Sequence, residues 1–226
     1  MPLLLNIDTA TEIASVCVSV NGQSVGYRQN GQQREHASFV HTAIAAVLKD
    51  AGFCLKDIDA FAVTSGPGSY TGLRVGMATA KGLCYALSKP LITVNTLEVM
   101  TWAALDNVEN IDEDWLLCPM IDARRMEVFT ALYNLKMEIV LPPAPVVLEK
   151  SIFNNYMKNK KIAFFGSGST KFRLIESNTN SVFLEIEHNA EHLGNLADKA
   201  CQQKKFSDIS YSEPNYFKDF HTIGKA

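Results

Sequence analysis

The stretch Thr64-Ser-Gly-Pro-Gly-Ser-Tyr-Thr-Gly-Leu-Arg-Val-Gly76 joins a short apolar run to an unusually apolar helical pattern at residues 72–88. Gly66 and Gly68 let the chain leave a strand abruptly, and Thr71 is well placed to cap the following helix. The amides at that helix start could bind an anion. The stretch is no Walker A loop, because no Gly-Lys-Ser/Thr follows, and it fits neither the dinucleotide fingerprint nor the nucleophile elbow. We therefore interpret it as a structural turn between a strand and a helix.

Outward from this turn, both halves of the chain show the same order of elements. In the first half, periodicity predicts strands at residues 3–7, 13–20, 24–29, 61–64 and 91–94 and helices at 35–51, 72–88 and 97–105. In the second half it predicts strands at 116–121, 127–135, 138–141, 162–165 and 182–186 and helices at 149–158, after Gly168, and at 191–204. Three antiparallel strands and then alternating helices and strands, twice over, predict an α/β protein. Its expected architecture is two duplicated ribonuclease H-like (actin-like, ASKHA) lobes, each a mixed sheet flanked by helices.

The acidic segment 106–114 is the expected boundary between the lobes. It divides the chain into an N-terminal lobe at residues 1–108 and a smaller C-terminal lobe with a tail at residues 109–226. The tail after Ser207 is short and aromatic, and we expect it to pack onto a lobe.

Charge and composition favour a cytoplasmic protein. The net charge is −3 and the pI is about 6.0, whereas a protein that grips nucleic acid alone usually carries a basic patch. We interpret the short basic groups, Arg124 and Arg125 among them, as solvated surface. No apolar run approaches the roughly 20 residues of a membrane span. Five cysteines without a C-x-x-C motif indicate reduced core thiols.

Two of the expected helices are apolar on two faces. In the helix at residues 72–88 only Arg74 and Lys81 are charged. One face of each helix must cover its own sheet, and the second face is either buried in a large core or an interaction surface. By helical phase, the expected interface residues are Phe39, Ala43 and Ala46 of the first helix and Arg74, Val75, Ala78 and Gly82 of the second.

The turn after the first strand leaves two interpretations open. Asp8, Thr9 and Thr11 could hold phosphate, as the D-x-[ST]-x turn of actin-like ATPases does with backbone amides and hydroxyls. The same residues could equally form a plain hairpin turn capped by Asp8 and Thr9.

The histidines do not predict a metal site. His36 and His41 are five residues apart, about 140° around a helix, where a helical zinc pair needs a spacing of four. His188 and His192 have that spacing, but Asn189 is the expected helix cap and leaves His188 outside the helix. We expect these histidines to face solvent.

Four segments resemble the TsaB (YeaZ) family, historically grouped with glycoprotease sequences. They are Asp8-Thr-Ala-Thr11, the stretch Thr64 to Gly76 quoted above, Ala80-Lys-Gly-Leu83 and Pro119-Met-Ile-Asp-Ala-Arg-Arg125. The likeness covers nearly the whole chain and is strongest from Thr64 to Glu98. Gly166-Ser-Gly168 and Glu213-Pro-Asn-Tyr216 match more loosely.

The resemblance implies that the chain has lost a metal site. In the catalytic paralogue, TsaD, the segment V-N-H-L-E-G-H supplies two histidines for the metal that polarises the threonylcarbamoyl group. The matching stretch here is Val94-Asn-Thr-Leu-Glu-Val-Met100, so Thr96 and Met100 stand in place of the histidines. A hydroxyl and a thioether are poor ligands for such a metal, and without it the transfer lacks its Lewis acid.

The implied function is therefore that of a non-catalytic subunit, required for threonylcarbamoylation of the tRNA adenosine next to the anticodon. The resemblance implies heterodimerisation with TsaD through the two apolar helices, turnover driven by the ATPase TsaE, and contact with tRNA only through the complex. Alone, the same surface could form a homodimer. No cofactor and no catalytic residue are expected in this chain.

Two other functions compete with this one. The first is a small actin-like ATPase that uses Asp8 and the glycine turns, although its second phosphate loop, at residues 121–125, would lack glycine. The second is a protease, which the old family label suggests but which no recognisable Ser/His/Asp or metal set supports.

Overall fold

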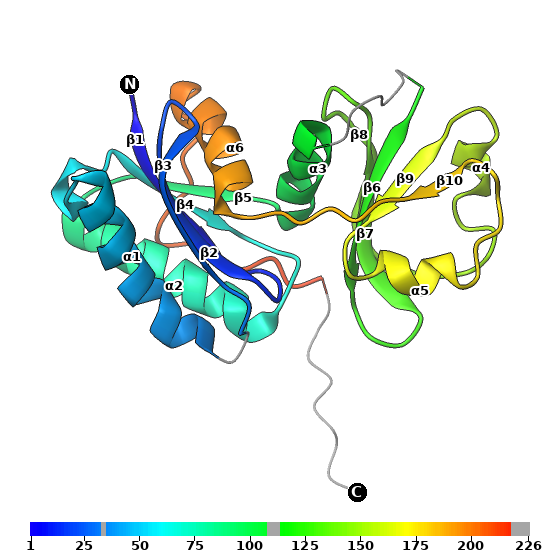
Figure 1. The fold of residues 1–226 in the computed structure, drawn as a ribbon, viewed down its shortest axis with the longest axis horizontal. Helices are drawn as coiled ribbons and strands as arrows, with labels where there is room; N and C mark the ends of the chain where they lie inside the picture. Colours follow the sequence, from blue (N-terminus) through cyan, green and yellow to red (C-terminus); the bar gives the residue numbers. More distant parts are fainter. Residues whose placement is uncertain (33–34, 108–113, 218–226) are drawn as a thin grey trace, which may run out of the picture.

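The computed structural model describes residues 1–32, 35–107 and 114–217. It contains two five-stranded sheets of the same topology (Figure 1). In the first sheet the order is β3-β2-β1-β4-β5, with strands β1 (Leu3–Asp8), β2 (Ala14–Val20), β3 (Gln23–Asn30), β4 (Ala60–Thr64) and β5 (Leu91–Val94). In the second the order is β8-β7-β6-β9-β10, with strands β6 (Leu116–Asp122), β7 (Glu127–Tyr133), β8 (Ile139–Val147), β9 (Ile162–Phe165) and β10 (Ser181–Phe183).

Strand directions confirm the predicted duplication. The strands β1, β2 and β3 are antiparallel neighbours, and β4 and β5 continue the sheet in parallel with β1. The strands β6, β7 and β8 repeat the antiparallel part, and β9 and β10 repeat the parallel part. Parallel neighbours need a crossover, which explains why helices follow the third strand in each half.

Helices cover both faces of the first sheet (Figure 1). On one face lie α1 (His36–Ala51) and α2 (Tyr70–Leu87), which bury Val40, Ile44 and Met77 against β1, β2 and β4. On the other face lies α6 (Ala190–Gln202), which packs Leu193 and Ala197 against Leu4 and Ala62. The two halves of the sequence therefore interlock, because α6 comes from the second half.

The helix α3 (Thr96–Asn107) follows β5 but packs on the second sheet, through Leu97, Met100 and Ala104. The short helices α4 (Asn154–Met157) and α5 (Ser169–Arg173) cover the other face of that sheet, where Phe153, Phe164 and Phe172 form an aromatic cluster. Both residues that flank the expected division at 108 and 109 lie outside the described part of the chain, so that division stays a prediction.

Some predicted bounds were wrong. Strand β8 runs to Val147, well beyond the predicted 138–141, because three prolines disguise it in the sequence. Prolines are tolerated there because β8 is an edge strand. The helix expected at 149–158 shrinks to Asn154–Met157, and the strand expected at 182–186 ends at Phe183. Within the described ranges, no helix has the length and apolar character needed to cross a membrane.

Candidate functional site

Three glycines explain why the chain folds as it does between Thr64 and Gly76. They lie four residues apart, with Gly68 just before α2 and Gly72 and Gly76 in its first two turns. A Cβ atom would come within 2.1 Å of the Ala10 carbonyl oxygen at Gly68 and within 2.1 Å of the Thr9 carbonyl oxygen at Gly72. The turn between β1 and β2 therefore rests directly on the glycine side of the helix. The expected strand-to-helix turn is confirmed, but Ser69 caps α2, and Thr71 is exposed in the first turn of the helix.

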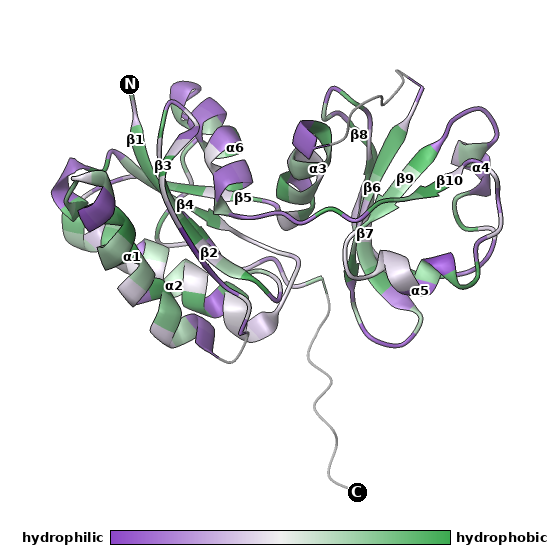
Figure 2. Cartoon of the chain, viewed as in Figure 1, coloured by the Kyte–Doolittle hydropathy of each residue, from purple (hydrophilic) through white to green (hydrophobic). Residues whose placement is uncertain are grey.

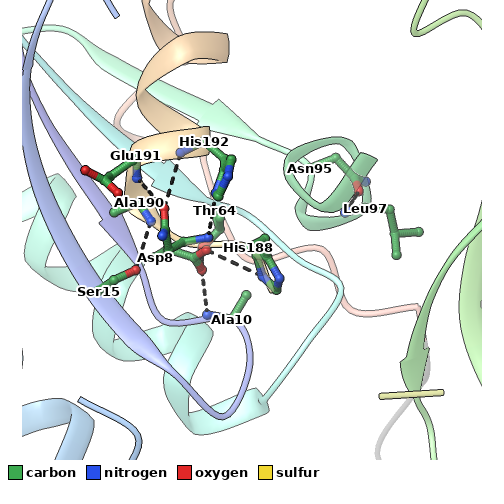
Figure 3. Close-up of polar contacts among 11 residues, drawn as sticks. Asp8, Ala10, Ser15, Thr64, Asn95, Leu97, His188, Ala190, Glu191 and His192 are labelled. Atoms are coloured by element: carbon green, nitrogen blue, oxygen red, sulfur yellow. Dashed lines mark hydrogen bonds and ion pairs between the residues drawn. The ribbon is translucent and has the colours of Figure 1, made fainter. Parts of the chain in front are cut away.

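The turn that could have held phosphate is engaged within the protein. Asp8 is buried, and its Oδ1 accepts hydrogen bonds from the Ala10 amide at 3.1 Å and the Thr64 hydroxyl at 2.9 Å (Figure 3). The Thr9 hydroxyl donates to the Gly72 carbonyl at 2.7 Å. Thr11 alone of the three predicted residues is half-exposed and lines the cavities described below.

Three of the four histidines named above do not face solvent, contrary to the prediction, whereas His41 does. The Nε2 atom of His36 lies 3.1 Å from the Glu12 carbonyl oxygen, so this side chain ties α1 to the β1–β2 turn. The Nε2 atom of His188 lies 3.5 Å from Oδ2 of Asp8, within ion-pair range but without the alignment of a hydrogen bond (Figure 3). The i,i+4 spacing had drawn attention to His188 and His192, but nothing in the sequence showed that β1 lies beside them.

His192 belongs to the cap of α6. Its Nδ1 atom accepts a hydrogen bond from the Asn189 amide at 3.1 Å, while the Asn189 side chain accepts one from the His192 amide. Burial lowers the pKa of His192, and repulsion from His188 lowers it further. His192 is therefore held neutral, in a structural role.

A cleft lies between the two sheets. Its main part is about 890 Å³ in volume and is bordered by the β1–β2 turn, the start of α2 and the β6–β7 loop. A cavity of about 180 Å³, lined by Met100, Ser167 and His188 among others, shares Thr11, Glu12, Ile121 and Ser167 with it. Hydroxyls of Thr11, Ser69, Thr71 and Ser167 and the side chain of Arg124 give this cleft a polar wall.

Thr96 and Met100, which the resemblance matches to the paralogue's histidines, do not suit a metal. Thr96 and Met100 are buried in the first turns of α3, and the Thr96 hydroxyl has no hydrogen-bond partner among the described residues. The Met100 methyl packs so closely on Gly166 that a side chain at that position would overlap it. Nowhere in the described ranges do three or more His, Cys, Asp or Glu side chains gather as a metal would need. We derive no step through a metal at this place.

The predicted interface residues divide by exposure. Arg74, Ala78 and Gly82 lie exposed along α2, and Val75 is half-buried beside them. On α1, Phe39 and Ala46 are half-buried, whereas Ala43 belongs to the core. Figure 2 shows α1 and α2 pale or green along much of their length, whereas α6 is largely purple.

The tail packs onto the first lobe, as expected. Its Asn215 amide donates to the Ser65 carbonyl at 2.7 Å, and Lys81 donates to the Ser212 carbonyl at 2.8 Å. The Arg74 guanidinium donates to the Tyr216 hydroxyl at 3.1 Å and lies 3.9 Å from the centre of the Tyr70 ring. The aromatic tail had no sequence feature that named Arg74 as its partner.

Comparison with known proteins places these features in a family. The family model described as "TsaD: tRNA N6-adenosine threonylcarbamoyltransferase" matches residues 29–219. The tRNA threonylcarbamoyladenosine biosynthesis protein TsaB of Bacillus subtilis is 25% identical over 220 residues, which cover 95% of this chain and 93% of that protein. A tRNA N6-adenosine threonylcarbamoyltransferase of Novosphingobium aromaticivorans is 39% identical over 119 residues, covering 43% of this chain and 34% of that protein.

Among solved structures, YeaZ from Pseudomonas aeruginosa superposes with a TM-score of 0.80 at 25% identity, covering 96% of this chain and all of that one. The chain therefore belongs to the TsaD family and, within it, to the TsaB (YeaZ) members.

Proposed function

We propose that this chain is a non-catalytic subunit in the synthesis of threonylcarbamoyladenosine in tRNA, and that it acts by binding a TsaD-type catalytic subunit through α1 and α2. The observation that carries this proposal is the first part of α3, where Thr96 and Met100, the residues that the family resemblance matches to the paralogue's metal-binding histidines, are both buried. A thioether packed on Gly166 and a hydroxyl closed off from solvent offer no site for a Lewis acid.

The outer side of α1 and α2 supports the docking part of the proposal. Gly82 is exposed, and no atom lies within 4 Å of the place where its Cβ would be, so a partner helix could approach the backbone closely. Tyr85, one turn further on, is 82% exposed. Beside α1 lies a groove of about 490 Å³, lined by that helix, by residues 53–55 and by Leu83 of α2, mainly through apolar side chains. A small-residue stripe beside exposed aromatic and aliphatic groups is typical of a protein interface.

The proposed occupant is the corresponding helix pair of a TsaD-type subunit. The relative of that name shares 39% identity with part of this chain, so it is expected to carry helices of similar shape. Two similar faces can pair about an approximate two-fold axis, so we propose that the same faces form a homodimer when the chain is alone. We place Arg74 at the edge of this interface, where Tyr70 and Tyr216 hold its guanidinium.

The remaining parts of the proposal concern the other components of the complex and the place where it works. A TsaE-type ATPase would act on the heterodimer, tRNA would reach this chain only in the complex, and the whole would work in the cytoplasm without a cofactor of its own. The boundary between residues 108 and 109 is part of the same proposal as a division of the sequence, across which α3 packs on the second sheet and α6 packs on the first.

Reconstitution tests this function. Purified chain and purified TsaD-type subunit, with the remaining components of the pathway, are assayed for threonylcarbamoyladenosine in tRNA by mass spectrometry of nucleosides. We expect product only when both proteins are present. Product formed by this chain without the TsaD-type subunit would overturn the non-catalytic assignment.

The cleft supports a second candidate, a nucleotide-binding protein. Its volume of about 890 Å³ and its hydroxyl-rich wall suit such a ligand. However, the donors of the Asp8–Thr11 turn are largely used inside the protein. Calorimetric titration with millimolar Mg-ATP decides this, because an absence of heat removes the candidate.

The protease candidate has less support. In the part of the chain that the structure describes, the three buried histidines contact the Glu12 carbonyl, Asp8, the Asn189 amide and the Asn107 side chain, and none hydrogen-bonds to a serine or cysteine. A nucleophile activated by a histidine needs that contact.

A further inference from the structure

The loop between β6 and β7 holds two consecutive arginines in an unfavourable backbone conformation. Arg124 has φ 67° and Arg125 has φ 51°, the left-handed region that residues with a Cβ seldom adopt. Glycine or asparagine would fit these positions better. Strained residues of this kind cluster at functional sites, where the surrounding structure holds them in place.

A set of hydrogen bonds braces this loop. The Arg124 amide donates to the Asp122 carboxylate at 2.6 Å, and the Asp122 amide donates to the Ser167 hydroxyl at 3.1 Å. Lys171 of α5 donates to the Asp122 carboxylate at 3.1 Å and to the Arg125 carbonyl at 2.8 Å. The brace pairs the Asp122 carboxylate with Lys171 and fixes the loop through its backbone, leaving the two arginine side chains out of the network.

The arginine side chains themselves are exposed and unpaired. Neither guanidinium makes a hydrogen bond, ion pair or ring contact with any residue in the described ranges. Arg124 lines the cleft opposite Ser69 and Thr71 at the start of α2, and the half-buried rings of Tyr70 and Phe129 line the same cleft. The loop therefore presents two free planar cations, of which Arg124 borders the cleft, whereas the Tyr70 ring already contacts Arg74 and Tyr216 and the Phe129 ring contacts Phe217.

This combination suits a nucleic-acid strand better than a compact nucleotide. Guanidinium groups bind phosphates in a bidentate manner, and two of them on one exposed loop can neutralise neighbouring phosphates of a strand. A compact polyphosphate would instead need free backbone amides deeper in the cleft, and there the Ala10 and Ser69 amides are already bonded to Asp8 and to the Ala10 carbonyl.

We propose that the tip formed by Arg124 and Arg125 contacts the phosphodiester backbone of RNA when the chain is in its complex. This inference rests on the proposed function, which brings tRNA to the heterodimer. It assigns to this subunit a direct share in holding the RNA, by charge and not by base sequence.

The test compares the salt dependence of RNA binding between the natural chain and variants that lack the two arginines. The heterodimer with the TsaD-type subunit is titrated against a fluorescein-labelled tRNA transcript at several KCl concentrations, and binding is followed by fluorescence anisotropy. The double variant Arg124→Gly/Arg125→Gly removes both cations while relieving the backbone conformation, so it is expected to fold at least as well as the natural chain. We expect about tenfold weaker binding at about 100 mM KCl and a log–log salt slope smaller by about 1 to 2.

Matched controls separate this contact from net charge and from folding. Lys158→Gly/Lys160→Gly removes two exposed cations elsewhere on the second lobe and is expected to leave the slope unchanged. Arg124→Lys/Arg125→Lys is expected to retain most of the slope, because phosphate neutralisation needs charge. Thermal unfolding of each variant shows that the fold is intact.

Three outcomes would overturn the proposal. One is an unchanged salt slope in Arg124→Gly/Arg125→Gly. Another is an equal loss of RNA affinity and salt slope in the control Lys158→Gly/Lys160→Gly. The third is that Arg124→Gly/Arg125→Gly loses Mg-ATP binding, measured by calorimetry, without any change in RNA binding. Formation of the heterodimer is measured separately, and the chain alone is titrated in parallel, so that failure of the proposed function is distinguished from failure of the arginine contact.

Discussion

At the residue scale, the glycines of α2 determine how closely the β1–β2 turn can approach the helix. The carbonyl oxygens of Thr9 and Ala10 occupy the space that a Cβ would need at Gly72 and Gly68. The contact is continued by the hydrogen bond from the Thr9 hydroxyl to the Gly72 carbonyl. A motif that looks like a ligand-binding loop in the sequence is thus explained by packing of the protein on itself.

Substitution of these glycines tests that explanation. Gly72→Ala is expected to lower the free energy of unfolding by about 2–3 kcal/mol or more, because a backbone carbonyl cannot move aside as a side chain can. Gly82→Ala, on the same helix, is the matched control. Nothing lies within 4 Å of its Cβ position, so it is expected to be neutral or to stabilise by up to about 1 kcal/mol. Urea unfolding measures both, and equal effects of the two changes would contradict the packing explanation.

His192 gives the stability a defined dependence on pH. Burial, and then repulsion from His188, lowers the pKa of His192 in the folded chain, although the carboxylates of Asp106, Glu191 and Asp8 oppose this. In the unfolded chain His192 binds a proton with its ordinary pKa of about 6.5, whereas the folded chain disfavours the protonated form. The contribution of neutral His192 to the free energy of unfolding is therefore fully present above about pH 6.5. It is lost as the pH falls through the lowered pKa of His192 in the folded chain. His192→Gln is expected to reduce the difference in the free energy of unfolding between about pH 7.5 and about pH 5.5, as measured by urea unfolding. A difference as large as that of the natural chain would contradict this role of His192.

At the element scale, α2 carries three different surfaces on one helix. One faces the sheet, one faces the tail through Arg74 and Lys81, and one is open along Ala78 and Gly82. The sequence predicted the open surface because apolar residues recur on two helical faces. It could not predict that Ala43 of α1 is buried, because helical phase does not say how far the neighbouring helix α2 covers α1.

Ala78→Glu tests the open surface. A carboxylate buried without a partner in a helix–helix interface is expected to cost about 3 kcal/mol or more, which weakens binding to the TsaD-type subunit about 100-fold. Asn154→Glu adds the same charge at an exposed helical position on the second sheet and is the matched control. Isothermal titration calorimetry measures both affinities. Equal affinities for the two variants would place the partner on another surface.

The elements differed in how well the sequence predicted them. Buried strands such as β1 and β4 were predicted because they are continuous apolar runs bounded by turns. Strand β8 and helix α4 were misjudged because both are partly exposed and their bounds depend on neighbouring elements. The approach of His188 to Asp8 could not be predicted, since 180 residues of sequence separate two groups that only the crossing of α6 brings together.

At the scale of the whole molecule, two lobes of the same topology enclose a polar cleft, while the surface that we propose for docking lies on the outer side of one lobe. Met100 lines the smaller cavity beside this cleft, and Thr96 is buried in the first turn of α3. Docking through α1 and α2 would leave the cleft and the Arg124–Arg125 tip accessible. The central claim is therefore that this chain works as a partner and not as a catalyst.

The measurement that tests this claim most directly is multi-angle light scattering on a size-exclusion column, with the 25.0 kDa chain alone and mixed with the TsaD-type subunit. The account predicts a new peak whose mass is the sum of one copy of each protein, and it predicts that Ala78→Glu abolishes this peak while Asn154→Glu keeps it. Separate elution of the two natural proteins, each at the mass that it has alone, would contradict the account.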